Sequence, residues 1–138
     1  MSNYNCLFSL HGMIQTIAVF ALLTGLYYAI KRPSGWFPKH RAWMFTFAVV
    51  ATIGAFVSLY AVEHRKQTPS SLSKCHGIIG MSLLLCIFLQ LTWAIVIRRH
   101  IQPELYLKVH RILAYTIVLL ASVSVYLGFQ NWKALRSS

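Results

Sequence analysis

Charged side chains are absent from four long stretches of the chain. No Asp, Glu, Lys or Arg occurs in residues 1–30, 42–62, 75–97 or 112–132. A hydrocarbon core of about 30 Å needs about 20 residues of helix, so each stretch is long enough to cross a bilayer. Lipid offers the backbone no hydrogen-bond partner, and stretches this long and apolar do not fit barrel strands. We therefore predict four transmembrane helices, over residues 5–30, 38–63, 72–98 and 105–130.

Composition supports a membrane protein and argues against two other classes. Of the 138 residues, 57% are hydrophobic and only 11% are charged, against roughly 25% charged in a soluble domain. The 13 Lys and Arg residues, opposed by two acids, cluster between the apolar stretches. A disordered chain or a soluble nucleic-acid-binding domain would not show this pattern. We predict an all-α integral membrane protein, one domain over residues 1–138, folded as an antiparallel four-transmembrane-helix bundle in a lipid bilayer, with no nucleic-acid partner.

The basic residues predict an orientation in the membrane. Four spans place both termini on one side, which we call side A, and the first and third loops on the opposite side B. Side B carries eight Lys and Arg residues and side A carries five. Because cytosolic segments are enriched in these residues, side B is predicted to be cytosolic and both termini non-cytosolic. The sequence does not identify the host membrane.

Four of the six histidines lie close to the N-terminal ends of the four predicted helices: His11, His40, His76 and His110. Successive helices run in opposite directions, so two histidines lie at a level near side A and two near side B. Alternate helices of a four-helix bundle stand diagonally across its core, so each pair can bind the iron of a flat porphyrin from both faces. A bare zinc or copper site would need three or four ligands at one level.

This layout predicts two non-covalent haems b, one held by His11 and His76 and the other by His40 and His110. Iron with two imidazole ligands suits electron transfer, because it changes redox state with little rearrangement. The helix rise places the two levels roughly 15–20 Å apart. A single histidine at a helix end is often only interfacial, but ionisable residues within spans are rare and usually functional. His64 and His100 lie in loops and are not predicted to bind iron.

The cysteines do not suggest another cofactor. No C-x-x-C-H motif or zinc-type spacing occurs, which excludes covalent c-type haem. Cys86 lies in the middle of a predicted helix and is expected to pack as a small hydrophobic residue. Cys6 and Cys75 both belong to side A and are expected to be unrelated thiols, with a disulfide as the alternative if that side is oxidising.

Small residues recur at fixed distances from the four histidines, where a cofactor needs room. Some directly follow a histidine or lie one turn beyond it: Gly12, Gly80 and Ala114. Others lie 14 residues after each histidine, about four turns further on nearly the same helix face: Gly25, Gly54, Gln90 and Ser124. We expect this second set to let each helix pass the haem that it does not ligate. Ordinary packing of small residues between transmembrane helices is the alternative.

Basic side chains are concentrated around the predicted side-B haem: Lys31, Arg32, Lys39, Arg41, Lys108 and Arg111. They are candidates for pairing with haem propionates and for attracting an anionic electron donor. They would equally serve as topology anchors alone. On side A, His64 and Lys74 are candidates for contact with an anionic acceptor.

Several short motifs accompany the histidines. The first helix carries His11-Gly12 and an aromatic-basic end over residues 27–32, and the second has Lys39-His40 near its start and an aromatic-acidic-His-Arg-Lys end over residues 60–66. The third carries Cys75-His76-Gly77-Ile78-Ile79-Gly80 with Gln90 downstream, and the fourth His110-Arg111 followed by Leu127-Gly128. With the four-histidine layout, these motifs resemble the four-helix core of the eukaryotic-type cytochrome b561 family, the ascorbate-linked transmembrane ferric reductases.

The resemblance covers residues 11–129 and implies an oxidoreductase with two b haems in the pairing given above. It implies electron flow from a cytosolic donor, typically ascorbate, to monodehydroascorbate or a ferric chelate on the other side. It also implies that side A is non-cytosolic, in agreement with the charge count. The family commonly has two further flanking helices, and it places an S-L-H motif on the third core helix, whereas Ser9-Leu10-His11 lies on the first helix here.

Two other functional classes remain open from the sequence. One is a quinol- or superoxide-linked di-haem cytochrome, in which Gln90 or Tyr115 would hydrogen-bond a quinone. The other is a haem-bearing membrane subunit of a larger redox complex, and a homodimer is a further possibility. A transporter or channel is disfavoured, because the polar residues within the spans are histidines at two levels and do not line a path.

Overall fold

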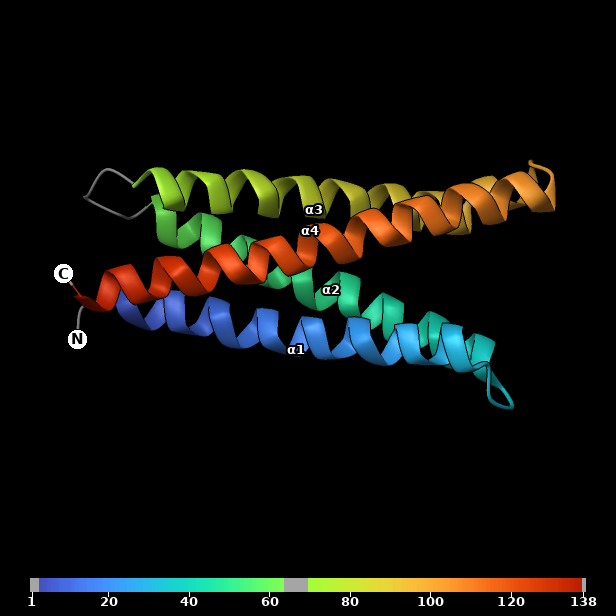
Figure 1. Cartoon of the computed structure of the whole chain (residues 1–138), viewed down its shortest axis with the longest axis horizontal. Helices are drawn as coiled ribbons and strands as arrows, with labels where there is room; N and C mark the ends of the chain where they lie inside the picture. Colours follow the sequence, from blue (N-terminus) through green and yellow to red (C-terminus); the bar gives the residue numbers. More distant parts are fainter. Residues whose placement is uncertain (1–2, 64–69, 138) are drawn as a thin grey trace. The chain divides into compact units, whose positions relative to one another are not determined.

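The computed structural model of the chain describes residues 3–63 and 70–137, and these residues form helices without any strand (Figure 1). The long helices are α1 (Asn3–Lys31), α2 (Trp36–Glu63), α3 (Ser71–Ile95) and α4 (Pro103–Ser137), and a short 3-10 helix, η1 (Ile97–Arg99), follows α3. All four long helices are long and apolar enough to span a membrane. The prediction of an all-α, multi-pass integral membrane protein is therefore confirmed.

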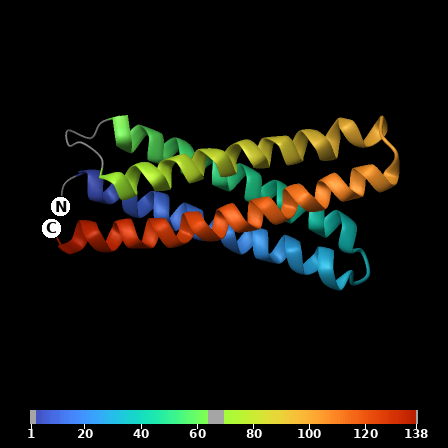
Figure 2. The ribbon, with the colours of Figure 1, turned by 45° about the horizontal axis from the view of Figure 1, so that its top comes forward.

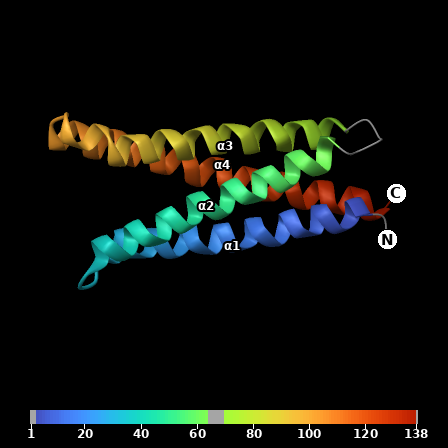
Figure 3. The same cartoon turned by 180° about the vertical axis from the view of Figure 1, so that it is seen from behind.

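The helices form two units, each of them a helical hairpin. In the first hairpin α2 returns alongside α1 (Figures 1 and 3), and in the second α4 returns alongside α3 (Figure 2). Because each hairpin is antiparallel, the start of one helix lies level with the end of its partner. The joining of both hairpins into one four-helix domain stays a prediction.

A tight turn closes the first hairpin. Pro33 disfavours a helical conformation at the residue before it, and Arg32 adopts a positive φ of 46°. The backbone N–H of Arg32 still donates to the carbonyl of Tyr28 at 3.1 Å. Gly35 has φ of 66°, a conformation that glycine adopts without strain. The chain therefore reverses within four residues, and α2 begins at Trp36.

The second hairpin has recognisable helix-start signals. Ser70 caps α3, because its hydroxyl accepts a hydrogen bond from the backbone N–H of Ser73 at 3.2 Å. Pro103 and Glu104 open α4, where a missing N–H costs nothing and a negative charge is favourable. The helix continues to Ser137 although the sequence prediction ended at residue 130. No proline or glycine follows Gly128 to stop it.

Small residues dominate the buried positions. Six of the ten buried hydrophobic residues are alanine: Ala18, Ala21, Ala48, Ala51, Ala61 and Ala121. Small side chains allow transmembrane helices to approach closely. Large apolar side chains such as Phe20, Phe56 and Leu119 are instead exposed, each by 64–65%, as expected for positions that face lipid.

Candidate functional site

In the first hairpin, both predicted ligand histidines hydrogen-bond to the backbone of the facing helix. His11 Nδ1 lies 2.8 Å from the carbonyl oxygen of Gly54, and His40 Nδ1 lies 2.9 Å from that of Gly25. A carbonyl oxygen only accepts, so Nδ1 must carry the proton in both rings. In the neutral ring the lone pair then belongs to Nε2. Histidines that bind metals are held in this way, because the outer hydrogen bond fixes both tautomer and ring orientation.

These bonds explain part of the regular spacing seen in the sequence. Gly25 lies 14 residues after His11 and Gly54 lies 14 after His40, and in an antiparallel hairpin each glycine comes level with the other helix's histidine. Both glycines are buried. A Cβ at Gly54 would lie 2.6 Å from Nε2 of Gln15, and one at Gly25 would lie 2.7 Å from Sδ of Met44. The glycines thus allow the close helix approach that lets each imidazole reach a carbonyl.

In the second hairpin, His110 contacts the side chain of Gln90. The amide Nε2 of Gln90 lies 2.9 Å from Nδ1 of His110 and 3.2 Å from its carbonyl oxygen. Gln90 is only 7% exposed. Like the glycines of the first hairpin, it lies 14 residues after the other histidine of its own hairpin. The same register therefore brings a side-chain amide, and not a backbone carbonyl, to His110.

An aromatic ring precedes each side-B histidine by one helical turn. Tyr106 stacks on His110 with ring centroids 5.6 Å apart and 23° between planes. Trp93 stacks on Tyr106 in turn, and its indole N–H donates to the Tyr106 carbonyl at 3.1 Å. Trp36 lies 6.2 Å from His40 at a tilt of 48°. These contacts restrict the two imidazoles on their faces, and the hydrogen bond to the Gly25 carbonyl restricts the edge of the His40 ring.

His76 packs against Gly128, which the candidate set from the sequence does not include. A Cβ at Gly128 would lie 3.1 Å from Cε1 of the imidazole. The offset of 14 residues selected Ser124, one turn earlier. Gly128 lies 18 residues after His110, which is five full turns at 3.6 residues each, and so it shares the face of His110 more closely. A search at whole-turn spacing would have found it.

The other small candidates are Gly12, Gly80, Ala114 and Ser124. Gly12 is exposed and the remaining three are half-buried. Among the described residues of its own hairpin, no atom lies within 4 Å of a Cβ placed at Gly80. Room for a bulky group beside His76, one turn earlier, is thus present within this hairpin.

The basic candidates of the first hairpin lie around its turn, where Lys31, Arg32, Lys39 and Arg41 are all exposed. Three of them lie over aromatic rings: Arg32 over Trp36 at 5.5 Å, Lys39 over Tyr28 at 5.6 Å and Arg41 over Phe37 at 5.8 Å. Such contacts hold the cations at the membrane surface, which suits topology anchors and anion attraction alike.

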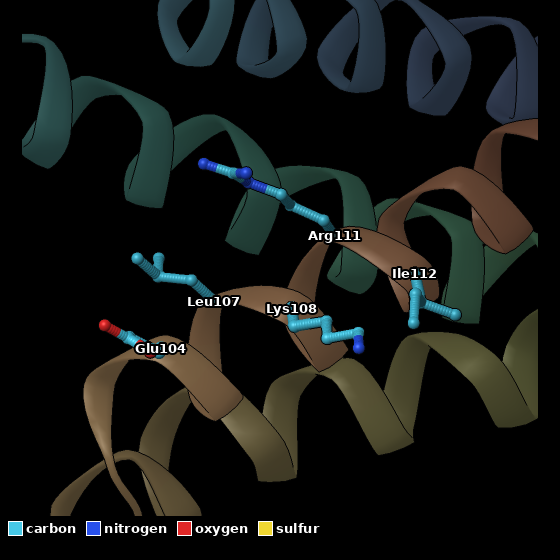
Figure 4. A pocket seen from close by; sticks show the side chains of 5 residues that line it. All are labelled: Glu104, Leu107, Lys108, Arg111 and Ile112. Atoms are coloured by element: carbon cyan, nitrogen blue, oxygen red, sulfur yellow. The ribbon is translucent and has the colours of Figure 1, made fainter.

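The basic candidates of the second hairpin line an open pocket on the first turns of α4. Lys108 and Arg111 line it together with Glu104, Leu107 and Ile112 (Figure 4). Both cations are exposed, and they flank His110 in the sequence. The pocket therefore places two positive charges and one negative charge close to a predicted iron ligand.

Of the remaining candidates on side A, the structure describes Lys74 and the cysteines. Lys74 is exposed on α3, and His64 lies outside the described residues. Cys6 and Cys75 are free and exposed, and Cys86 is half-buried. Among residues 3–63 and 70–137, no group of three or more His, Cys, Asp or Glu side chains lies together as a bare metal ion would need.

Comparison with known families gives one match. The family model for eukaryotic cytochrome b561 matches residues 38–135, a segment that contains His40, His76 and His110 with most of α2 and α4 and all of α3. His11 and the rest of α1 precede it. Neither the curated proteins nor the solved structures give a significant match.

Proposed function

The chain belongs to the eukaryotic cytochrome b561 family, and from this we propose that it is a di-haem protein that carries electrons across a membrane. The family consists of transmembrane oxidoreductases that bind haem b, and four membrane-spanning helices agree with that class. The proposal concerns the number of haems, their ligands, the electron donor and the electron acceptor.

We assign one haem to His11 and His76 and the other to His40 and His110, so that each hairpin supplies one ligand to each haem. The observation that supports ligation is the donation from Nδ1 of His11 and His40 to backbone carbonyls at 2.8 and 2.9 Å, and the pairing follows from the predicted levels of the four histidines. This donation leaves Nε2 of each neutral ring as the nitrogen with a lone pair. A histidine that only lies at a membrane interface does not require its proton on Nδ1.

The bound haems would supply a one-electron couple at each level. Two imidazole ligands per iron favour electron transfer, since reduction then needs little rearrangement. The residues of the chain would orient the imidazoles and exclude water between the levels. The exposed cations on side B, among them Lys108 and Arg111, would attract an anionic cytosolic donor such as ascorbate. Monodehydroascorbate or a ferric chelate would receive the electron on side A, where Lys74 is exposed.

The first test is the visible spectrum of the detergent-purified full chain, with haem quantified per chain, before and after ascorbate is added. Two haems b per chain and fast reduction by ascorbate would support the proposal. Two haems reduced only by a quinol would keep the haem assignment and move the donor to the quinone class. A chain that binds no haem would refute the assignment of all four histidines.

The pairing of ligands has its own test in two single variants. His76→Ala should lose the haem that it shares with His11 and keep the other, and His110→Ala should do the reverse. Each variant should therefore hold one haem per chain, with a reduced-minus-oxidised spectrum that differs between them. Retention of both haems in either variant would contradict the pairing.

A further inference from the structure

The closed end of the first hairpin, residues 31–41, carries four basic side chains and no acidic one. We call this segment the basic turn. All four basic side chains are exposed: Lys31, Arg32, Lys39 and Arg41. Glu63 is the single acid in the first 63 residues, and it lies about 33 Å beyond Arg41 along α2, at 1.5 Å per residue. The positive charge of the basic turn is therefore not neutralised by an acid of its own hairpin.

The basic turn lies at the surface of the membrane. It joins two apolar helices that are each long enough to span the bilayer, Cys6–Lys31 and Trp36–Glu63 (Figure 3). Lys39 and Arg41 lie only about 5–8 Å beyond Trp36 along α2, and long basic side chains extend over such distances to reach the interface. All four cations can therefore reach the level of the lipid phosphates.

Aromatic rings hold three of these cations in place. The pairs, with the distance from the cation to the ring centroid, are Arg32 on Trp36 at 5.5 Å, Lys39 on Tyr28 at 5.6 Å and Arg41 on Phe37 at 5.8 Å. The contact between Lys39 and Tyr28 joins α2 to α1. A cation over a ring keeps N–H groups that point away from the ring, because Lys has three donors and Arg has five. An anion that binds here therefore meets donors that are already oriented.

The headgroup of an anionic phospholipid fits these features. Its phosphate accepts hydrogen bonds from ammonium and guanidinium groups, and clusters of four or more Lys and Arg beside a transmembrane helix are typical of anionic-lipid binding. A zwitterionic lipid also brings an ammonium group, for which the basic turn has no carboxylate. The second hairpin differs in this respect, because its pocket combines Lys108 and Arg111 with Glu104 (Figure 4).

We propose that the basic turn binds an anionic phospholipid, whose phosphate accepts hydrogen bonds from Arg32, Lys39 and Arg41. The acyl chains of this lipid lie along the apolar surface of the first hairpin. The site does not involve the haems, and it leaves Lys108 and Arg111 of the second hairpin to the soluble electron donor.

The test is native mass spectrometry of the full chain in detergent, titrated with phosphatidylglycerol or with phosphatidylcholine of the same acyl chains. We expect the wild type to bind phosphatidylglycerol at least about tenfold more tightly. The double variant Arg32→Gln, Lys39→Gln should bind it about 25-fold more weakly than the wild type, because each cation near an anionic lipid contributes about fivefold. Tyr28→Leu keeps every charge but removes the ring under Lys39, and it should weaken binding about two- to fivefold.

The double variant Lys74→Gln, Lys133→Gln is the matched control. It also removes two exposed cations, and Lys133 likewise lies over a ring, that of Phe129, at 4.6 Å. This variant should bind phosphatidylglycerol as the wild type does. An equal loss in both double variants would overturn the proposal, because net charge alone would then govern binding.

Two results on the wild type would overturn the proposal even if a variant failed to fold. One is equal affinity for the two lipids. The other is displacement of phosphatidylglycerol by an equal concentration of ascorbate, which would assign the basic turn to a soluble anion. None of these measurements depends on haem, so the proposed electron transfer stands or falls separately.

Discussion

Gly128 offers a direct test of the His76 site, because its missing side chain leaves room for the imidazole. A Cβ at this position would lie 3.1 Å from Cε1 of His76, whereas carbon atoms in good contact are about 3.5–4.0 Å apart. In Gly128→Ala the ring must therefore retreat by about 0.4–0.9 Å. Binding sites tolerate about 0.5 Å of displacement, so this change is at the limit. In Gly128→Leu the side chain would take the place of the ring.

We expect Gly128→Leu to hold one haem per chain, as His76→Ala should, and Gly128→Ala to hold the same haem roughly 10-fold more weakly, the effect typical of a lost positioning contact. Replacing glycine by alanine inside a helix favours the helix by up to about 1 kcal/mol. The loss of haem should therefore occur without a loss of helix content. Haem per chain and far-ultraviolet circular dichroism, measured on the same purified samples, separate the two effects.

Gly77→Leu is the matched control on the same hairpin. Gly77 directly follows His76 in the sequence, is exposed, and has no described atom within 4 Å of a Cβ built on it. This variant should keep two haems. The reasoning would be refuted by Gly128→Leu with two haems and unchanged potentials, since His76 would then not need the space at Gly128.

Two further predictions concern the first hairpin and the basic pocket. Gly54→Leu should push α1 from α2, because its Cβ alone would lie within 3.1 Å of two side chains of α1. The haem bound by His11 should then be lost, whereas Phe56→Leu, at an exposed position of α2, should keep it. Equal haem content in both variants would contradict this. Lys108→Glu and Arg111→Glu should each slow the reduction of haem by ascorbate about 10-fold at low salt, which is the lower end of electrostatic steering effects. The rate of reduction by a neutral quinol should change little. Stopped-flow rates measured over a range of salt concentrations test this, and rates equal to the wild type would leave the two cations as anchors only.

The helices could be predicted from the sequence because lipid leaves the backbone few options. Each charge-free stretch is long enough for one span, and the flanking cations mark its ends. The extension of α4 to Ser137 was not predicted, since the end of an apolar stretch does not end a helix when no proline or glycine follows. The bends of the chain at Arg32 and Gly35 depend on local backbone angles that hydrophobicity does not report.

The candidate site was predicted less completely, because the sequence shows spacing but not contact. Gly25, Gly54 and Gln90, which the 14-residue offset predicts to give a haem room, each contact the histidine of the facing helix. The expected reason, room for a haem to pass, stays a prediction, whereas the observed contact is a hydrogen bond to the imidazole. Gly128 was not selected, since the rotation of α4 about its axis decides whether it or Ser124 meets His76.

The hydrogen bonds of His11 and His40 have a consequence for how the protein is made. Both bonds lie between α1 and α2, so nothing beyond Glu63 is needed to form them. A nascent chain that has released only its first hairpin into the bilayer can therefore already hold two imidazoles with their protons on Nδ1. Haem would then bind last, to side chains of the first hairpin that were oriented before His76 and His110 had been translated.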